Sequence, residues 1–411
     1  MAEAHGAVIT GAGITCGLGN SAGEIAACLQ QGRFAASRPF FAQEAAAMVT
    51  LGFNPDYVPL PGDARLETRR RESPGARMSR LLEDVIAAAI HEAGIEASVL
   101  GQRDVQVYAG AAAPHADVIN CMAYLRRNDA VDLKVQPGIR ELHSRQHSQE
   151  DFARALMSRY RLSRPPHCVF TASCSSMSAL YLASQAIESK RISLALVLCW
   201  QEITLFDLLF LQGIGGLSRQ LAQPFAENSD GVLPAACIGA LVLQQPGRHC
   251  RGIHIAGFAA AQNAGSARMS TVFAPDFRNI AGVMSAALRK ANVTTRQIRC
   301  IFAHGNGIRG CDNAESLAVR KVWAECCAPL VSYKSQIGYS LGSSALLDLA
   351  LIADAFRRQR ILAASSRVAL NSPPGLHLHA DCEPLKFDQG SIMKIALGMD
   401  GSILVAILAR N

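Results

Sequence analysis

The sequence predicts an α/β fold in which helices cover a mixed sheet of buried strands. Short runs of β-branched and apolar residues alternate with longer amphipathic stretches, which is the pattern of strands connected by helices. Half of the 411 residues are hydrophobic, enough to bury one large core or two. Near the midpoint, the polar, turn-forming segment 244–249 separates two stretches that each open with an apolar strand. We therefore expect two similar halves, residues 1–245 and residues 246–411.

Each expected strand is a short apolar run rich in β-branched residues, and each expected helix is a longer stretch with apolar residues at helical spacing. The expected strands are 7–10, 105–109, 167–171, 194–198, 240–244, 253–258, 300–303, 394–397 and 402–408. The expected helices are 21–31, 78–93, 149–160, 175–189, 281–291, 314–322 and 344–357. Two polar segments, 40–76 and 122–147, show little periodicity, and we expect them to be excursions from the fold and not domains.

The composition favours a cytoplasmic protein. The longest apolar stretches, such as 192–200, are much shorter than the roughly 20 residues that a membrane-spanning helix needs. The N-terminal segment lacks the basic leader and the cleavage site of a signal peptide. The 13 cysteines make no C-x-x-C pair, so we interpret them mostly as buried apolar residues and expect no metal site.

The net charge of +7 is moderate, and part of it lies in one arginine-rich stretch. Such a stretch can steer an acidic partner, although a solvated basic loop is the simpler interpretation. No aromatic residues or nucleic-acid motifs accompany it, so binding to RNA or DNA is not expected. The residues of the stretch are Arg65, Arg69, Arg70, Arg71, Arg77 and Arg80.

A glycine-rich segment at 10–17 follows the first expected strand. Its spacing is G-x-G-x-x-x-G, and the next helix starts only at Asn20 or Ser21. These glycines therefore do not place a phosphate at the start of that helix. We expect a turn here and no bound nucleotide.

The most informative segment runs from Val169 to Ile187. A strand that ends in small residues turns abruptly into an apolar helix, which places the turn residue at a helix N-terminus. Such a position suits a nucleophile, because the helix dipole and the free N–H groups stabilise an anion there. Serine is also a favoured N-cap residue, so the pattern alone leaves an ordinary helix cap equally open.

This segment resembles the nucleophile segment of β-ketoacyl synthases, in which a strand leads into T-A-C-S-S and an apolar helix. Aligning Thr171 and Ala172 on that motif places Ser173 at the position of the acyl-accepting cysteine, and only this register matches the downstream helix without a gap. A shift of one residue restores Cys174 as the nucleophile. Further blocks that resemble the family in the same order are 8–13, 224–225 with 229–233, 301–305 with 312–315, and 334–339.

The resemblance implies a thiolase-like layered αβαβα fold of two similar halves. It also implies a catalytic set of one cysteine, which accepts the acyl chain, and two histidines, which assist decarboxylation of a malonyl thioester. The matching positions here are Ser173, His304 and Tyr339, supported by an ion pair of Lys334 with Glu315. Serine needs a general base to attack, and tyrosine cannot share a proton near pH 7 as imidazole does. We therefore expect acylation of this chain to fall sharply.

The other departures from the family pattern lie where substrate would enter. Asn306-Gly307-Ile308 replaces the T-x-T that binds pantetheine. The segment 398–401, with Met399 and Asp400, replaces the G-F-G-G gating loop, and 234–237 replaces a G-E-G-A type of loop. The side chains that we expect to contact or shape an acyl tunnel are Tyr124, Phe170, Met177, Phe206 and Met399.

The resemblance therefore favours a chain length factor, the non-condensing half of a ketosynthase heterodimer in type II polyketide, aryl polyene or fatty-acyl chain elongation. Its expected partners are an active ketosynthase and an acyl carrier protein. The carrier protein brings the phosphopantetheine, so no cofactor is expected on this chain. Three alternatives stay open: an acyltransferase with Ser173 as nucleophile and His304 as base, a divergent synthase that uses Cys174, and a scaffold that docks a carrier protein without an acyl tunnel.

Overall fold

The computed structural model describes residues 6–40, 55–61, 74–110, 149–247, 250–262, 275–324, 327–371 and 375–410. Its strands are β1 Val8–Cys16, β2 Arg38–Pro39, β3 Asp56–Tyr57, β4 Val105–Gly110, β5 His167–Val169, β6 Leu194–Gln201, β7 Cys237–Gln244, β8 Ile253–Gln262, β9 Ile298–Phe302, β10 Leu330–Val331, β11 Arg360–Ile361, β12 Leu385–Lys386, β13 Ser391–Leu397 and β14 Ser402–Arg410. Its helices are α1 Ala22–Gln30, α3 Pro74–Ala93, α5 Gln149–Tyr160, α6 Ser175–Glu188, α7 Leu205–Gly213, α8 Phe277–Ala291, α9 Arg309–Trp323, α10 Lys334–Ile337 and α11 Ser344–Arg358. Two 3₁₀ turns matter below, η5 Ala172–Cys174 and η7 Leu341–Ser343.

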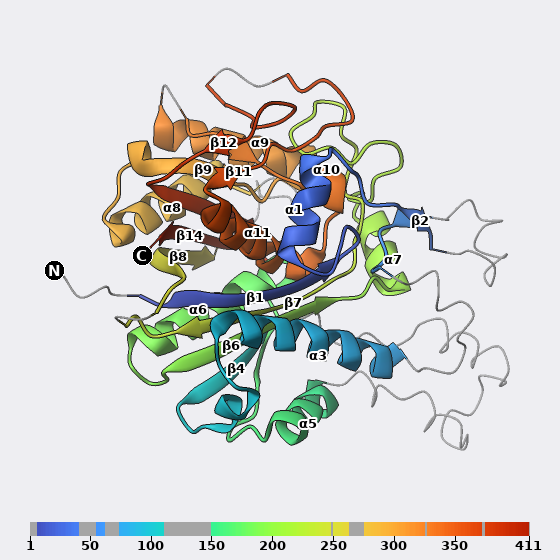
Figure 1. Ribbon diagram of the computed structural model, residues 1–411. Coiled ribbons are helices and arrows are strands. Elements are labelled where there is room, and N and C mark those ends of the chain that lie inside the picture. The colour runs from blue at the N-terminus through green and yellow to red at the C-terminus, as the bar shows by residue number, and fades with distance from the viewer. Residues whose placement is uncertain are drawn as a thin grey trace, which may run out of the picture.

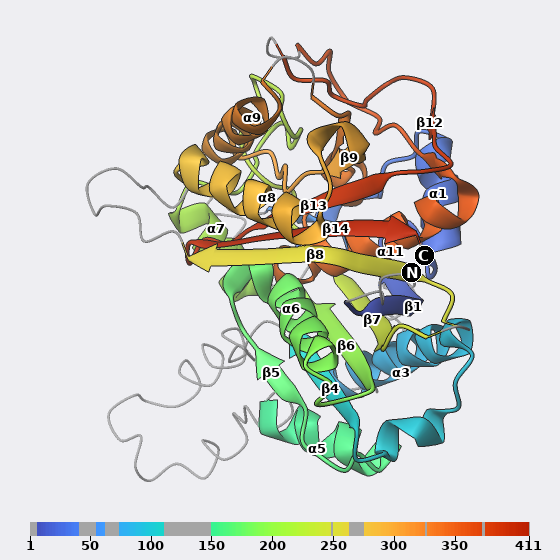
Figure 2. The same ribbon diagram turned by 90° about the vertical axis from the view of Figure 1, so that its left-hand side faces the viewer.

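One ten-stranded sheet runs through the whole molecule, in the order β10-β9-β13-β14-β8-β1-β7-β6-β4-β5. Figure 1 shows the strands of both halves between the helices. β8 and β1 lie side by side at its centre, where Val8 pairs with His254 and Ile9 with Ile253 in antiparallel register (Figure 2). The strands on one side of this junction all precede Gln245 in the chain, and those on the other side all follow Gly252. The two parts of the chain therefore form one continuous sheet.

The two halves of the sheet repeat one topology. From the centre outward, the ladder is antiparallel twice and then parallel twice, as β1-β7-β6-β4-β5 in one half and β8-β14-β13-β9-β10 in the other. In each half a 3₁₀ turn leads into a central helix, and both turns begin with a non-glycine residue at φ 43°, Ala172 and Leu341. The predicted α/β fold of two similar halves is confirmed, while a division at residues 245 and 246 stays a prediction.

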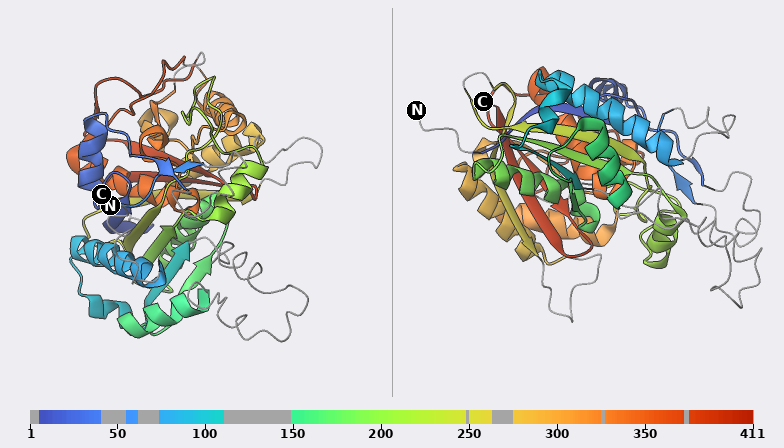
Figure 3. Two further views of the ribbon diagram at one scale, coloured as in Figure 1. Left: turned by 90° about the vertical axis from the view of Figure 1, so that its right-hand side faces the viewer. Right: turned by 90° about the horizontal axis from the view of Figure 1, so that it is seen from below.

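Helices and sheet form five layers, α, β, α, β and α. α6 and α11 pack against each other between the two halves of the sheet, and a large cluster of buried residues, including Met177 and Leu346, surrounds them. α3 and α5 cover the outer face of the N-terminal half, and α8 and α9 cover the outer face of the C-terminal half (Figures 1 and 3). Each sheet face thus buries its apolar side chains against helices, as the layered fold requires.

The glycine-rich segment is part of a strand, so the predicted turn at this place is wrong. β1 continues through it to Cys16, with a bulge between Ile9 and Gly11. A Cβ on Gly13 would lie 1.9 Å from the carbonyl oxygen of Val85, and a Cβ on Gly11 would lie 2.0 Å from that of Ala89. The glycines are needed because the backbone of α3 packs directly on β1.

α7 is absent from the predicted helices, although the sequence carries a signal for it. Thr204 and Asp207 form a capping box, in which each side chain accepts a hydrogen bond from the backbone N–H of the other. The T-x-x-D spacing is the mark of such a box. Three predicted helices also begin earlier than expected: α3 at Pro74, α8 at Phe277, where Asp276 caps it, and α9 at Arg309.

Part of the predicted features lies outside the described residues. These are residues 41–54 and 62–73 of the segment 40–76, the segment 122–147 with Tyr124, and the arginine-rich stretch apart from the backbone of Arg77 and the whole of Arg80. Within the described ranges, no helix is long and apolar enough to cross a bilayer. In that same part of the chain, no group of three or more His, Cys, Asp or Glu residues has the geometry to hold a metal ion.

Candidate active site

A strained turn brings Ser173 to the amino end of α6. β5 leads into η5, whose first residue, Ala172, has φ 43°, a left-handed conformation that is uncommon for a residue with a Cβ. The Ser175 hydroxyl closes the turn, since it accepts the Thr171 N–H at 3.0 Å and donates to the Ala172 carbonyl at 2.7 Å. Ser173 is buried in this elbow, next to the helix N-terminus.

Cys174 faces the apolar core. Its side chain is fully buried among the central cluster, and its Sγ lies 3.6 Å from the carbonyl oxygen of Ser402. Burial raises the pKa of this thiol well above its usual value, and the nearby Asp400 carboxylate raises it further. Because the thiolate is the reactive form of cysteine, this environment suits a structural residue better than a nucleophile.

Tyr339 lies beside Ser173 and His304. The neighbouring Ser173 and Asn306 side chains slightly favour the ionised phenol, and the Tyr339 ring packs edge-on against the His304 ring, with centroids 5.7 Å apart. Burial nevertheless raises the pKa of the phenol far above neutrality, so Tyr339 stays protonated. The structure therefore brings the three predicted positions, Ser173, His304 and Tyr339, into one cluster.

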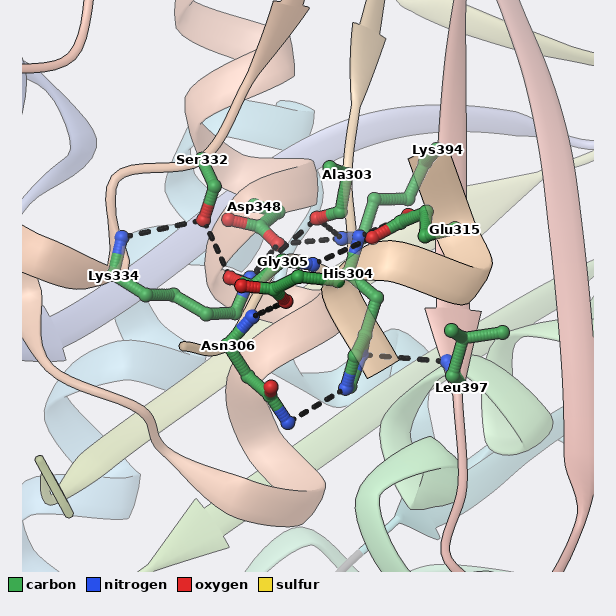
Figure 4. A network of polar contacts seen from close by, with 11 residues as sticks. Ala303, His304, Gly305, Asn306, Glu315, Ser332, Lys334, Asp348, Lys394 and Leu397 are labelled. Carbon is green, nitrogen blue, oxygen red and sulfur yellow. Dashed lines mark hydrogen bonds and ion pairs between the residues drawn. The ribbon is translucent and has the colours of Figure 1, made fainter. Parts of the chain in front are cut away.

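The ring of His304 lies between two N–H groups (Figure 4). The backbone nitrogen of Leu397 lies 3.3 Å from Nδ1, and the Asn306 Nδ2 lies 3.2 Å from Nε2. Burial lowers the pKa of the imidazole well below its usual value, and the ammonium groups of Lys334 and Lys394 add to the effect. The ring is therefore neutral at pH 7. Among the described residues, no hydrogen bond joins Ser173 to His304.

The predicted ion pair of Lys334 with Glu315 is not formed. The Nζ of Lys334 lies 3.3 Å from Oδ2 of Asp348, and the Nζ of Lys394 lies 2.6 Å from the same oxygen (Figure 4). Both ammonium groups also donate to the carbonyl oxygen of Ala303, at 3.5 Å and 3.1 Å. Asp348 is therefore the acidic partner of Lys334, and it serves a second lysine as well.

Glu315 has a different role, because its two carboxylate oxygens are already bonded to backbone. They accept the N–H groups of His304 and Gly305 at 2.7 Å and 2.8 Å. Glu315 is fully buried on α9, directly beside the loop that follows β9. It therefore fixes the backbone of His304, while the lysines act on it only through charge.

Asp312 holds the next part of the same loop. Its carboxylate accepts three backbone N–H groups at 2.8 to 3.2 Å. Burial raises the pKa of Asp312 to about 7, with a smaller rise from Glu315, whereas the three donors oppose the rise. The donors are Phe225, Asn306 and Gly307.

Asp400 closes the turn between β13 and β14. Its carboxylate accepts the N–H of Ser402 at 3.1 Å and the hydroxyl of Ser402 at 2.7 Å. The N–H of Gly398 donates to the carbonyl of Ser402 at 2.8 Å, and the Gln262 amide donates to the carbonyl of Asp400. The turn that carries Met399 is thus tied by side-chain bonds that glycine at position 400 could not make.

The side chains expected to shape an acyl tunnel differ in their burial, and Tyr124 lies outside the described residues. Met177 is fully buried in the central core, on α6. Phe170 is 52% exposed just beyond β5, and Phe206 is 46% exposed on α7, where it stacks on Phe210. Met399 is half-buried in the turn after β13. Of these, Phe170 lies closest in sequence to Ser173, at the same end of β5.

Sequence reasoning missed Asp348, Lys394 and the side-chain role of Asn306. The sequence does contain signals for Asp348 and Lys394. Lys394 interrupts an apolar strand that is buried along its length, and Asp348 interrupts an equally buried stretch of α11. A charge inside a buried element requires a counter-charge, so these two residues could have been paired from the pattern. The contact of Asn306 with His304 depends on a loop conformation that no spacing rule predicts.

Two family models match this chain. The model of the β-ketoacyl synthase N-terminal domain matches residues 6–248, and the model of the β-ketoacyl synthase C-terminal domain matches residues 254–366. Both the elbow and the loop with His304 lie within these ranges.

One protein with a similar sequence is the pikromycin polyketide synthase component PikAII from Streptomyces venezuelae. It is 26% identical to this chain over 335 residues, which cover 78% of this chain and 8% of the relative. The chain therefore corresponds to a small part of that much longer protein.

Solved structures with the same fold include the ishigamide ketosynthase/chain length factor, with a TM-score of 0.82 and 20% identity over 99% of both chains. They also include the ketosynthase ApeO in complex with its chain length factor ApeC from Xenorhabdus doucetiae. For this one the TM-score is 0.77 and the identity 20%, over 99% of this chain and 98% of the other. At such identities the likeness establishes the fold.

Proposed function

This chain belongs to the β-ketoacyl synthase family, and we propose that it is a non-condensing subunit of the chain-length-factor type. It pairs with an active ketosynthase that builds a polyketide or a related acyl chain. One observation carries the proposal: both ring nitrogens of His304 face other partners, and among the described residues no hydrogen bond joins Ser173 to His304. A serine hydroxyl without a general base is a poor acyl acceptor.

The protonation state of Tyr339 supports the same proposal. Its phenol stays protonated at neutral pH because burial raises its pKa. It can donate a hydrogen bond, but it cannot take up and release a proton as a histidine does. Only His304 is left of the two histidines that assist decarboxylation in condensing members of the family.

The pairing with a second subunit is supported by the edge of the sheet. β5 is the last strand, and in the described part of the chain it is paired on one side only, with β4. Phe170 projects from the end of this strand with half its surface exposed. An open strand edge beside an exposed aromatic residue is a favourable place for another chain to add. We propose that the ketosynthase docks here and that an acyl carrier protein serves the pair.

Intact-mass measurement after incubation with an acyl-carrier-protein thioester tests the missing acylation. We expect no adduct on the wild-type chain and the same result for Ser173→Ala. A stable acyl group on Ser173 or Cys174 would overturn the proposal and favour an acyltransferase or an active synthase.

Co-expression with the ketosynthase from the same gene neighbourhood tests the pairing. We expect the two chains to co-purify in equal amounts. Recovery of this chain only as a homodimer, with the ketosynthase in separate fractions, would contradict the proposal.

A further inference from the structure

A thiol and an imidazole face each other on the segment that leads into β12 (Figure 1), outside the cluster around Ser173. The Sγ of Cys382 lies 3.3 Å from Nδ1 of His379. Cys382 is exposed, whereas the other cysteines in the described part of the chain are buried or half-buried. His379 is only 4% exposed. A buried base thus faces a thiol that solvent reaches.

The backbone of Ile361 assigns the proton of the His379 ring. A carbonyl oxygen can only accept a hydrogen bond, and the carbonyl oxygen of Ile361 lies 3.2 Å from Nε2. Nε2 therefore carries the proton, and Nδ1 keeps a lone pair that accepts the S–H of Cys382. Burial lowers the pKa of the imidazole, so the ring is neutral at pH 7. Both neighbours of the ring are compatible with this one tautomer.

Backbone hydrogen bonds hold the two side chains in this arrangement. The N–H of His379 donates to the carbonyl of Leu330 at 2.8 Å, and the carbonyl of His379 accepts the N–H of Ala364 at 3.0 Å. The N–H of Asp381 donates to the carbonyl of Ala364 at 2.8 Å, and its carboxylate accepts the N–H of Ser366 at 3.0 Å. The ring and the thiol therefore meet without a rearrangement of the chain.

The charges around Cys382 make its thiol dependent on a base. Burial raises the pKa of Cys382, and the carboxylates of Asp381 and Glu383 raise it further. The thiolate is the nucleophilic form of cysteine, so little of the attacking species exists at pH 7 without assistance. His379 can assist by taking the proton of the thiol as the sulfur attacks. The nearest charge effect on His379 itself comes from His377.

We propose that Cys382 is a modification site whose thiol exchanges with a low-molecular-weight disulfide, with His379 as the general base. The S–H proton moves to Nδ1 of His379 while the sulfur attacks one sulfur of the disulfide. The S–S bond of the disulfide breaks, and one half leaves as a thiolate. The other half stays on Cys382 in a mixed disulfide. Cys382 is thereby oxidised and the leaving half is reduced. The inference does not depend on the proposed function.

The test follows the reaction of the folded full chain with dithiobis(nitrobenzoate), a disulfide that releases a coloured thiolate. We expect one fast thiol at pH 7, which peptide mapping locates at Cys382 and which Cys382→Ser removes. In His379→Gln the amide can still donate to the Ile361 carbonyl but takes up no proton. Its rate at pH 7 is expected to be lower by about tenfold or more. The difference is expected to shrink above about pH 9, where the thiol ionises without a base.

His377→Gln, which changes an exposed histidine on the same segment, is the matched control and is expected to react at the wild-type rate. With oxidised glutathione, intact mass is expected to show one mixed disulfide on the wild-type chain and none on Cys382→Ser. Equal rates for the wild type and His379→Gln would overturn the role of the base. A first reaction at another cysteine would overturn the site.

Thermal unfolding shows whether His379→Gln keeps the fold. If it does not, a synthetic peptide of residues 376–387 is the reference, because it contains the same thiol, histidines and carboxylates without the folded arrangement. We expect the thiol of the folded chain to react about tenfold faster than that of the peptide at pH 7. A peptide that reacts as fast as the folded chain would overturn the inference.

Discussion

At the scale of single residues, the charges behind His304 are balanced only as a group. The ammonium groups of Lys334 and Lys394 share one oxygen of Asp348, and all three side chains are at least nine-tenths buried. Burial lowers the pKa of Lys394, and the Asp348 carboxylate opposes that change. Two buried cations with one shared anion depend strongly on that anion, because an unpaired charge in the interior is costly.

Replacing Asp348 with asparagine is therefore expected to destabilise the fold by about 3–5 kcal/mol, the usual cost of removing one partner of a buried ion pair. Chemical denaturation measures the free energy of unfolding. Asp354→Asn makes the same change on the same helix, where the partners Arg357 and Arg358 are 52% and 40% exposed. Its expected cost is below about 1 kcal/mol. Equal losses for the two variants would refute the shared role of Asp348.

The lowered pKa of His304 makes the free energy of unfolding depend on pH in the acidic range. Its folded-state pKa lies well below 6.5, so below pH 6.5 the unfolded chain binds a proton that the folded chain does not. The contribution of this residue to stability is therefore lost as the pH falls through 6.5, by up to about 1.4 kcal/mol per pH unit. The raised pKa of Asp312 acts in the opposite direction over the same range, because the folded chain then binds the extra proton.

The comparison of wild type with His304→Gln isolates the histidine. We expect the unfolding free energy of the variant to fall less between pH 7 and pH 5 than that of the wild type. Parallel pH profiles would show that His304 is not held neutral by the fold.

At the scale of elements, α3 packs so close to β1 that the strand has no room for a Cβ at two positions. Gly11 and Gly13 lie on β1 at the line of contact with α3. In both halves, a 3₁₀ turn that begins with a left-handed non-glycine residue leads into the central helix. The close approach of backbones, rather than a ligand, explains the glycine pattern near the N-terminus.

Gly13→Ala is accordingly expected to lower the free energy of unfolding by about 3 kcal/mol, since its Cβ forces α3 away from the sheet. Gly282→Ala is the control, because this glycine lies on the exposed face of α8 and a Cβ there meets no atom within 4 Å. Alanine in a helix interior is favoured over glycine by about 1 kcal/mol, so this variant is expected to gain stability. Thermal unfolding of both variants checks the two signs.

At the scale of the whole molecule, helices cover the faces of the sheet, and in the described part of the chain β5 is paired on one side only. Helices cover the outer faces of both halves, and α6 and α11 fill the space between them. β5 at one edge is only three residues long and is followed by exposed Phe170. We propose that the partner subunit docks at this edge, next to β5 and Phe170.

Phe170→Asp is expected to weaken association with the co-expressed ketosynthase by about tenfold or more, as for an aromatic residue at the centre of an interface. The unfolding free energy of the isolated chain is expected to change little, because the side chain is half exposed. Leu317→Asp, at a leucine 44% exposed on α9, is the control for a general effect of added charge. Undiminished co-purification of Phe170→Asp would place the interface elsewhere.

The fold class and most of the helices and strands can be predicted from the amino-acid sequence. Apolar runs and amphipathic periods are local properties, so α5 is predicted to the residue and most strands to within a few residues. The resemblance to the family also identified Ser173, His304 and Tyr339 as positions of one site, and the structure brings them together.

The hydrogen-bond and ion-pair partners of these residues follow from how distant segments pack. Lys334 and Glu315 match a family pattern, yet Lys334 pairs with Asp348, which lies fourteen positions along the chain on a different helix. The glycines of β1 are required because the backbone of α3 packs against them. The position of Asn306 depends on a loop that the Asp312 carboxylate holds. Hydrogen bonds and ion pairs act over a few ångströms, so they depend on distances that exist only after distant segments have packed.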